Sequence, residues 1–354
     1  MFVALRDLRF AQGRFALMGV VVTLITLLVV LLSGLTAGLG RGNTSAITGL
    51  PADHLVFAAP ADGQTLTYAE SSISPSVQEA WSHVHGVVRA DAIAISMSRA
   101  GAEEGRTAGV AVFAVTPGSP LAGEVDDGQV VLSTKAATSL AVSPGDPVDL
   151  GGRALTVAAV SGDDEFSHAP VVWVAMADAP GTGQAPGSAT VLALTTDGAD
   201  LSAADEQLGT VTLTPDGSLA AIGSYASENG SLQLMRALLF AISALVIGAF
   251  FTVWTVQRSG EIAILKAIGA STAYLLKDAL GQALALLAVG TVLGTALAAG
   301  VGAAIRGAGV PFVLDLPTLV TPALVMVLLG LTGAAVSLRS VTTVDPLTAL
   351  GSAR

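Results

Sequence analysis

Side chains that could carry covalent chemistry are scarce in this 354-residue sequence. Cysteine is absent, which excludes disulfides, thiolate metal sites and a cysteine nucleophile. The sequence contains neither the phosphate-binding pattern G-x-x-x-x-G-K-[ST] nor the zinc pattern H-E-x-x-H, and its serines lie in no nucleophile elbow. We therefore expect the chain not to be an enzyme.

Metal-ligand side chains form two short groups. His83 and His85 are two residues apart, which puts them on one face of a strand but on different faces of a helix. Three acidic residues follow one another at 163–165, and the other histidines are His54 and His168. Neither group has a typical ligand spacing, so we expect solvent-exposed or locally bonded histidines, a solvated acidic turn and no metal site.

The elements that must position any site belong to a membrane protein. Hydrophobic residues make up 52% of the chain and charged residues 12%, and the mean hydropathy is +0.71. Residues 41–230 hold 22 of the 27 acidic and 6 of the 16 basic residues, a net charge of −16, whereas the rest of the chain carries +5. This segregation indicates an acidic domain on one side of a membrane and argues against nucleic-acid binding.

Apolar runs long enough to cross a bilayer occur four times. A helix of about 20 residues spans roughly 30 Å, the thickness of the hydrocarbon core. The runs are Phe15–Leu32 with an extension to Gly38, Ala237–Val256, Ala279–Ile305 and Leu319–Leu338. The first run is longer than the 7–15 apolar residues of a signal peptide, so we interpret it as an uncleaved span rather than a cleaved signal. Because the spans are nearly free of charge, energy for any transport must come from a partner.

Basic residues set the orientation. Arg6, Arg9 and Arg14 precede the first span, and Lys266 and Lys277 follow the second, so both termini are expected in the cytoplasm of a cell-membrane protein. The predicted fold class is an α-helical membrane protein with four transmembrane helices and a large extracellular α+β domain inserted between the first and second. The predicted segments are a cytoplasmic N-terminal segment 1–14, transmembrane helix 1 at 15–40, the extracellular domain 41–230, transmembrane helix 2 at 231–256, a cytoplasmic coupling helix 257–276, transmembrane helix 3 at 277–305, an extracellular loop 306–317, transmembrane helix 4 at 318–338 and a cytoplasmic tail 339–354.

Within the extracellular domain, short runs rich in Val, Ala and Thr are bounded by turn residues and predict strands. They cover 108–115, 129–132, 154–160, 171–175 and 190–195, and short helices are predicted at 76–84 and 134–141. Small-residue pairs in the spans, Gly34/Gly38, Gly290/Gly294 and Gly330/Gly333, could support dimerisation. Glycine is also common in transmembrane helices for other reasons.

The segment Gln257–Ser271, Q-R-S-G-E-I-A-I-L-K-A-I-G-A-S, resembles the FtsX-like permeases, the membrane subunits of MacB-type ABC transporters. The layout of one span, a large domain and three further spans is also similar to that family, as is the tail 344–350. The resemblance implies that this segment contacts a separate ATPase. The residues that match the family pattern and would make this contact are Arg258, Glu261, Leu265, Lys266 and Gly269.

The residues of this segment agree with a docking helix. Ile262, Leu265 and Ile268 recur at helical spacing and form an apolar stripe, with Lys266 off it. Gly269 is placed to end the helix. The alternative is an interfacial helix that lies on the membrane.

A narrower resemblance, to the heme-efflux permeases of Gram-positive bacteria, rests on residues 223–232 and 247–258. Tyr225 and Glu228 match their pattern, whereas Ser224 and Asn229 replace a Gly and a Gln. This resemblance implies a homodimer that takes heme from the membrane as its transported substrate, with no permanent cofactor.

In that interpretation Tyr225 or Glu228, which share a face of a helix, would ligate the heme iron, and Arg236 would neutralise a propionate. Tyr68 and Glu70 form the second candidate heme-binding pair. The simpler alternatives are a solvated helix-start acid for Glu228 and an interfacial anchor for Tyr225.

Taken together, these observations predict a permease subunit that works with two ATPase copies by mechanotransmission and that contacts membrane lipids. The alternatives are export of another amphipathic substrate, such as a lipid, lipopeptide or antibiotic, and a non-transporting signal transmitter that controls a cell-wall enzyme.

Overall fold

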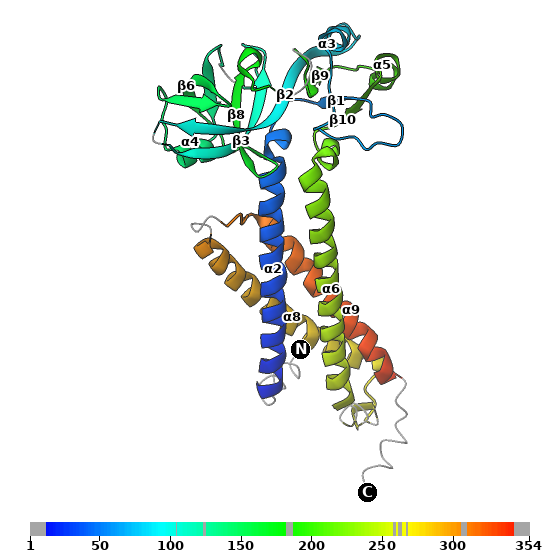
Figure 1. The fold of residues 1–354 in the computed structure, drawn as a ribbon. Coiled ribbons are helices and arrows are strands. Elements are labelled where there is room, and N and C mark those ends of the chain that lie inside the picture. The colour runs from blue at the N-terminus through cyan, green and yellow to red at the C-terminus, as the bar shows by residue number, and fades with distance from the viewer. Residues whose placement is uncertain are drawn as a thin grey trace. The chain divides into compact units, whose positions relative to one another are not determined.

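The computed structural model describes residues 12–103, 105–122, 125–181, 187–257, 260, 264–266, 268–305 and 310–342. The chain divides into two compact units, a membrane unit of residues 1–38 and 231–354 and an extracellular unit of residues 39–230. Four helices in the described ranges are long and apolar enough to span a membrane (Figure 1). The predicted fold class, four such helices with a large domain between the first and second, is therefore confirmed.

The four helices are longer than the apolar runs that revealed them. They are α2 (Gln12–Thr48), α6 (Gly223–Gln257), α8 (Thr272–Ile305) and α9 (Leu316–Thr342). Hydropathy marks where apolar residues end, but a helix continues for as long as its backbone bonds are made. In α2 the polar end stays helical, and the hydroxyls of Thr44 and Thr48 donate back to the carbonyls of Gly40 and Thr44.

Glycines bring the helices of the membrane unit into close contact. A Cβ added to Gly294 of α8 would lie 2.6 Å from the Thr23 carbonyl oxygen of α2. Gly330 of α9 faces the Leu287 side chain of α8, where an added Cβ would lie 2.6 Å from the nearest atom. The small-residue pairs of α8 and α9 are thus occupied by packing inside the chain.

The helices α6 and α9 also meet through small residues. A Cβ on Gly333 would lie 3.3 Å from the Cα of Gly248. Beside it the Ser337 hydroxyl donates to the Gly248 carbonyl at 3.0 Å and lies 2.9 Å from the Thr252 hydroxyl. Backbone approach and interhelical hydrogen bonds together hold this pair in an apolar medium.

The segment before α9 packs against the first and third helices. The Phe312 ring fills a notch at Gly34 and Gly302, where an added Cβ would lie 2.4 Å from the ring in either case. The Val313 N–H donates to the Gly34 carbonyl at 3.1 Å. Gly34 and Gly38, one of the pairs considered for dimerisation, therefore make their close contacts with Pro311 and Phe312 of the same chain.

The extracellular unit is built on one ten-stranded sheet in the order β10-β1-β9-β2-β3-β8-β4-β6-β5, with β7 paired to β8. Its pairs are antiparallel except β3–β8 and β4–β6. The strands are β1 (His54–Ala58), β2 (Val87–Ala102), β3 (Thr107–Val115), β4 (Gln129–Leu132), β5 (Pro147–Leu150), β6 (Arg153–Val160), β7 (Glu165–Phe166), β8 (Ala169–Ala175), β9 (Val191–Thr196) and β10 (Thr210–Leu213). The short helices are α3 (Pro75–Ser82), α4 (Thr134–Leu140) and α5 (Leu201–Leu208).

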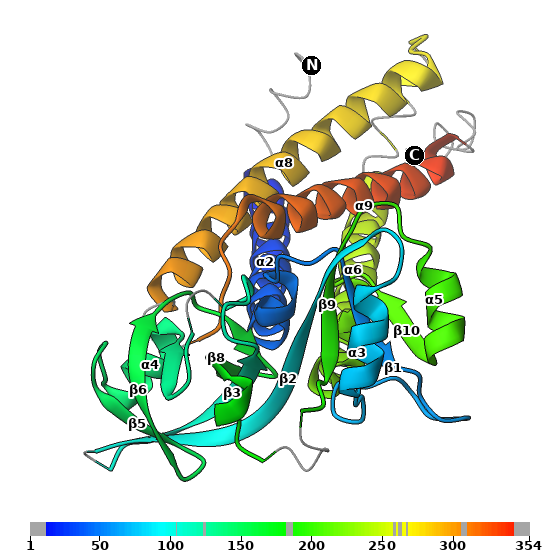
Figure 2. The ribbon, with the colours of Figure 1, turned by 90° about the horizontal axis from the view of Figure 1, so that it is seen from above.

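Strand β2 joins two lobes of this unit. Its first part pairs with β9 and its last part with β3 and β5 (Figure 2). Because β5 pairs with both β6 and β2, strands β2, β3, β8, β4, β6 and β5 form a closed ring around an apolar core. The other lobe buries Trp81 of α3 and Leu192 of β9 in a separate core.

A third core of the extracellular unit contains Phe57, Tyr68 and Phe166. Aromatic rings meet edge to face there: Tyr68 contacts Phe57 and Phe166, with ring centroids 4.8 and 5.4 Å apart. Phe166 is the last residue of β7, so this packing fixes the two-residue turn that follows it.

Candidate functional site

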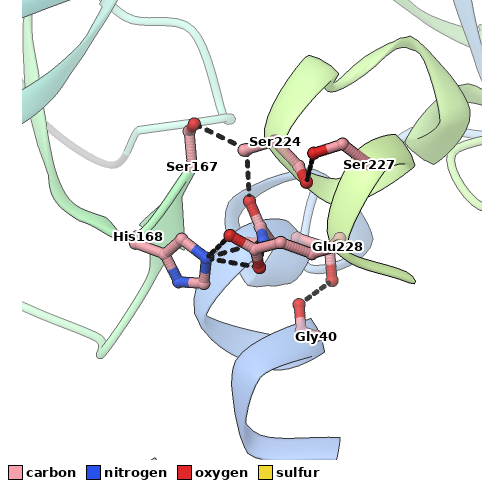
Figure 3. A network of polar contacts seen from close by, with 8 residues as sticks. Gly40, Ser167, His168, Ser224, Ser227 and Glu228 are labelled. Atoms are coloured by element: carbon pink, nitrogen blue, oxygen red, sulfur yellow. Dashed lines mark hydrogen bonds and ion pairs between the residues drawn. The ribbon is translucent and has the colours of Figure 1, made fainter. Parts of the chain in front are cut away.

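Three segments that are distant in sequence bring one polar side chain each to a common point. Asn43 lies near the end of α2, His168 lies in the turn between β7 and β8, and Glu228 lies near the start of α6. The His168 Nε2 atom is 2.8 Å from Glu228 Oε2 and 2.8 Å from Asn43 Nδ2 (Figure 3). Asn43 Nδ2 is 3.0 Å from Glu228 Oε2. The three side chains therefore form a compact triangle of polar atoms.

Buried hydrogen bonds hold Asn43 in this triangle. Asn43 is 1% exposed, and its Oδ1 accepts a 2.6 Å hydrogen bond from the Ser224 hydroxyl of α6. The Ser224 hydroxyl lies 2.7 Å from that of Ser167 in the β7–β8 turn. By contrast, the side chains of His168 and Glu228 are 36% and 40% exposed, so two of the three groups remain open to solvent.

The backbone of the turn is unusual. Ser167 and His168 have positive φ values of 52° and 65°, in the left-handed region that two-residue hairpins usually fill with Asn or Gly. Their N–H groups donate to the carbonyls of Asn43 and Gly42 of α2, at 3.1 and 2.9 Å. These two bonds hold a non-glycine turn in a conformation that is unfavourable for it, and such strain concentrates at functional sites.

The predicted pair Tyr225 and Glu228 lies in the first turns of α6, which begins at Gly223. Tyr225 is half-buried and packs on the core of the extracellular unit. Glu228 is not simply a solvated helix-start acid, because Asn43 and His168 bond to its carboxylate. Arg236 lies eight residues after Glu228 on α6, is half-buried, and belongs to the membrane unit. Their roles toward heme stay predictions.

The second candidate pair is split between core and surface. Tyr68 is 5% exposed and its hydroxyl lies 2.7 Å from that of Ser218. Burial raises the pKa of the Tyr68 phenol, only partly offset by the Ser218 hydrogen bond, so the tyrosinate form is disfavoured. Glu70 is exposed, and both residues line a cavity of about 700 Å³ that also touches Ser167 and Ser224.

Only part of the predicted ATPase-contact segment is described. Arg258 and Glu261 lie outside the described residues. Leu265 and Ile268 are exposed and Lys266 is half-buried. Gly269 has a φ of 101°, its N–H donates to the Lys266 carbonyl, and the Ala270 N–H donates to the Leu265 carbonyl. These bonds form a Schellman cap, so the prediction that Gly269 ends this helix is confirmed.

His168 and Asn43 were missed from the sequence as site residues. Asn43 follows the apolar run of the first span, and the sequence pattern places it at the start of the polar domain. His168 precedes a predicted strand, but it lacks the Asn-Gly signal of a two-residue turn. Their only sequence signals are a polar residue in the continuing helix register and an isolated histidine.

The acidic residues at 163–165 have different environments. The pKa of the Asp164 carboxyl is raised because the group is partly desolvated and lies near Asp163. Glu165 forms an ion pair with Lys135. Across the described ranges no three His, Asp or Glu side chains come together as a metal cluster.

Comparisons with known proteins assign both parts of the chain. Residues 15–211 match the MacB-like periplasmic core domain, and residues 234–346 match the FtsX-like permease C-terminal domain. The first match alone covers more than half of the 354 residues.

Relatives of similar length extend over nearly the whole chain. The sequence is 27% identical over 361 residues, 99% of each chain, to proteins of two Staphylococcus epidermidis strains described as "Putative hemin transport system permease protein HrtB". A Staphylococcus haemolyticus protein of the same description is 38% identical over 130 residues, 37% of each chain.

Solved structures of low similarity were also found. The extracellular domain of the ABC-type transporter YknZ from Gram-positive bacteria has 17% identity and a TM-score of 0.33, covering 45% of this chain and 97% of that one. The periplasmic region of MacB from Actinobacillus actinomycetemcomitans has 12% identity and a TM-score of 0.35, covering 48% of this chain and 92% of that one.

The two family matches agree with four membrane helices and one large domain inserted between the first and second of them. They establish that the chain belongs to the MacB-like, FtsX-type family of ABC transporter permeases.

Proposed function

We propose that this chain is the permease subunit of an ABC transporter that takes heme from the membrane and exports it. The observation that carries the proposal is the pair of half-exposed ligand side chains, His168 and Glu228, held next to each other in the turn after β7 and near the start of α6. The full-length similarity to proteins described as hemin permeases supports the same cargo.

The chemistry of the pair suits ferric heme. An imidazole nitrogen is a common axial ligand of heme iron, and a carboxylate oxygen is a hard donor that suits the ferric state. Metal–ligand bonds of roughly 2 Å place two axial ligands about 4 Å apart across the iron. Since His168 Nε2 and Glu228 Oε2 are 2.8 Å apart, the observed arrangement is a closed one, and cargo enters when the two side chains separate.

The drive for this separation would come from a partner ATPase. Asn43 and Glu228 lie on α2 and α6, two helices that also supply candidate membrane spans. A movement of either helix changes the Asn43–Glu228 contact. We propose that two ATPase copies move the helices of a homodimer through the 257–271 segment, with the termini in the cytoplasm, and so open and close the site.

Isosteric removal of the Glu228 charge is expected to weaken hemin binding. Glu228→Gln keeps the side-chain volume but replaces an anionic oxygen donor by a neutral amide. We expect at least about a tenfold loss of affinity, equal to about 1.4 kcal/mol, in a Soret titration of the purified permease–ATPase complex. Glu206→Gln, which alters an exposed acid on α5 away from both candidate pairs, is the matched control and should titrate like wild type. A wild-type protein with no saturable Soret change would rule out the heme assignment.

The ATPase contact can be tested separately. Ile264 and Ile268 are 57% and 79% exposed in the predicted contact segment. Replacing both by serine removes apolar area worth about 1.5–3 kcal/mol per side chain if a partner covers them, so ATPase recovery in a pull-down should fall at least tenfold. Leu316→Ser, which alters an equally exposed residue at the start of α9, should leave recovery unchanged. Full recovery with the double variant would contradict this contact.

The alternatives make different demands on the extracellular domain. A signal transmitter that binds a cell-wall enzyme needs a broad apolar surface. In the described part of residues 39–230, the large exposed hydrophobic side chains are Val88 and Met97, nine residues apart on β2. This favours transport. Export of a lipid or lipopeptide would be indicated if these amphipaths, and not hemin, stimulated the ATPase.

A further inference from the structure

The triangle of Asn43, His168 and Glu228 contains a hydrogen-bonding conflict. The three contacts of 2.8, 2.8 and 3.0 Å are all short enough to require a proton between each pair of atoms. An amide nitrogen donates only, an ionised carboxylate accepts only, and an imidazole nitrogen does one or the other.

Each tautomer of His168 leaves one contact unmade when the Glu228 carboxylate is ionised. If Nε2 carries a proton, it donates to Glu228 but faces the Asn43 amide as a second donor at 2.8 Å. If Nε2 is unprotonated, it accepts from Asn43 but faces the carboxylate as a second acceptor at 2.8 Å. Neither form satisfies the triangle.

Turning the Asn43 amide by 180° changes what the triangle can bind. Oxygen and nitrogen of an amide are interchangeable in shape, so the assignment follows from the hydrogen-bond partners. With Oδ1 inward, three Lewis-basic atoms converge, and Nδ2 points outward to donate to the Ser224 hydroxyl. Ser224 can then donate to Ser167, whose oxygen is 2.7 Å away. A cation at the centre completes this arrangement.

The geometry of the centre suits a metal ion. The Glu228 side chain is 40% exposed, so an ion from solution can reach the three atoms. Ligands that share one ion at bonds of about 2.1 Å are about 3 Å apart in cis octahedral positions and about 3.4 Å apart in a tetrahedron, so a tetrahedral Zn²⁺ requires the three atoms to move apart by about 0.5 Å. The three pairs of atoms here are 2.8 to 3.0 Å apart. We propose that His168 Nε2, the Glu228 carboxylate and Asn43 Oδ1 bind a divalent transition-metal ion such as Zn²⁺.

Two independent features support this site. His168 is held at a positive φ of 65°, an uncommon conformation for a non-glycine residue that concentrates at functional sites. Residues 39–230 are also strongly acidic, and such a field raises the local concentration of cations. An imidazole ligand favours Zn²⁺, Ni²⁺ or Cu²⁺ over Mg²⁺ and Ca²⁺.

The metal site does not depend on heme being the cargo. The bound ion would tie α2, the β7–β8 turn and α6 together, and it would use the two side chains proposed for heme iron. Zn²⁺ and hemin are therefore expected to compete for the same protein.

The test is a Zn²⁺ titration of the tag-free, full-length permease against a chromogenic chelator, with a large excess of Mg²⁺ present. Wild type should bind one Zn²⁺ per chain, and His168→Gly and Asn43→Leu should each lose at least tenfold in affinity. Asn43→Asp is the diagnostic variant. A second carboxylate beside Glu228 repels it in an empty triangle but adds a charged ligand to a metal site, so Zn²⁺ affinity should rise at least tenfold and Zn²⁺ should raise the melting temperature of this variant more than that of wild type.

Absence of saturable Zn²⁺ binding in wild type, or affinities unchanged in His168→Gly and Asn43→Leu, would overturn the proposal. A Soret titration on the same samples separates it from the cargo assignment. Hemin binding without Zn²⁺ binding refutes the metal site alone, and Zn²⁺ binding without hemin binding refutes the heme assignment alone.

Discussion

Replacing Gly294 of α8 by alanine is expected to destabilise the membrane unit. The added Cβ would lie 2.6 Å from the Thr23 carbonyl oxygen and 2.8 Å from the Thr26 Cβ. Backbone atoms cannot rotate away, so α2 and α8 must separate, and overpacking of this kind typically costs about 1–3 kcal/mol. The measurement is the thermal unfolding midpoint of the purified protein in detergent, together with its elution profile.

Gly300 provides the matched control on the same helix. A Cβ added to Gly300 meets nothing within 4 Å, so Gly300→Ala introduces the same methyl group without a clash and improves helix propensity. We expect its midpoint to equal or exceed that of wild type. If the two variants melt at the same temperature, the close approach of α2 and α8 is not a source of stability.

The second large effect is expected from His168→Gly, which should separate stability from binding. Glycine adopts positive φ without strain, which recovers about 1 kcal/mol. Loss of the contacts to Glu228 and Asn43 offsets this by a similar amount, about 1 kcal/mol for an exposed pair. The unfolding midpoint should therefore stay within a few degrees of wild type, while hemin affinity falls at least tenfold because an axial ligand is lost.

Ser167→Gly is the control for the turn itself. Ser167 has a φ of 52° and precedes His168, so the substitution relieves similar strain but keeps the imidazole. It removes the Ser224 contact and should bind hemin nearly as tightly as wild type. Equal loss of hemin binding in both variants would show that the turn conformation matters and that the imidazole does not act as a ligand.

The sequence by itself determined the order of membrane spans and domain along the chain. Apolar runs of bilayer length and the basic residues beside them predicted four spans around one acidic domain, because the bilayer imposes length and composition on any helix that crosses it. The predicted short strands at 108–115 and 129–132 are β3 and β4 in the structure. The long strand β2 was not predicted, because its exposed polar residues, such as Arg89, interrupt the apolar pattern.

The Gly269 helix end was also readable from the sequence, since a left-handed cap depends on one local residue. Glu228 could be singled out by its place in a family pattern. What surrounds Glu228 could not, because its partners, Asn43 and His168, are 185 and 60 residues away along the chain.

Tertiary structure alone decided how these residues are used. Closure of the sheet and the aromatic packing on Phe166 place the β7–β8 turn against the end of α2, and this contact turns an isolated histidine into a ligand candidate. The glycine pairs show the same limit. Their spacing indicates close helix approach, but only the folded chain shows that Gly294 faces α2 and Gly333 faces α6. Local composition determines where a helix lies in a membrane, whereas the partner of each helix face depends on contacts between residues that are far apart in sequence.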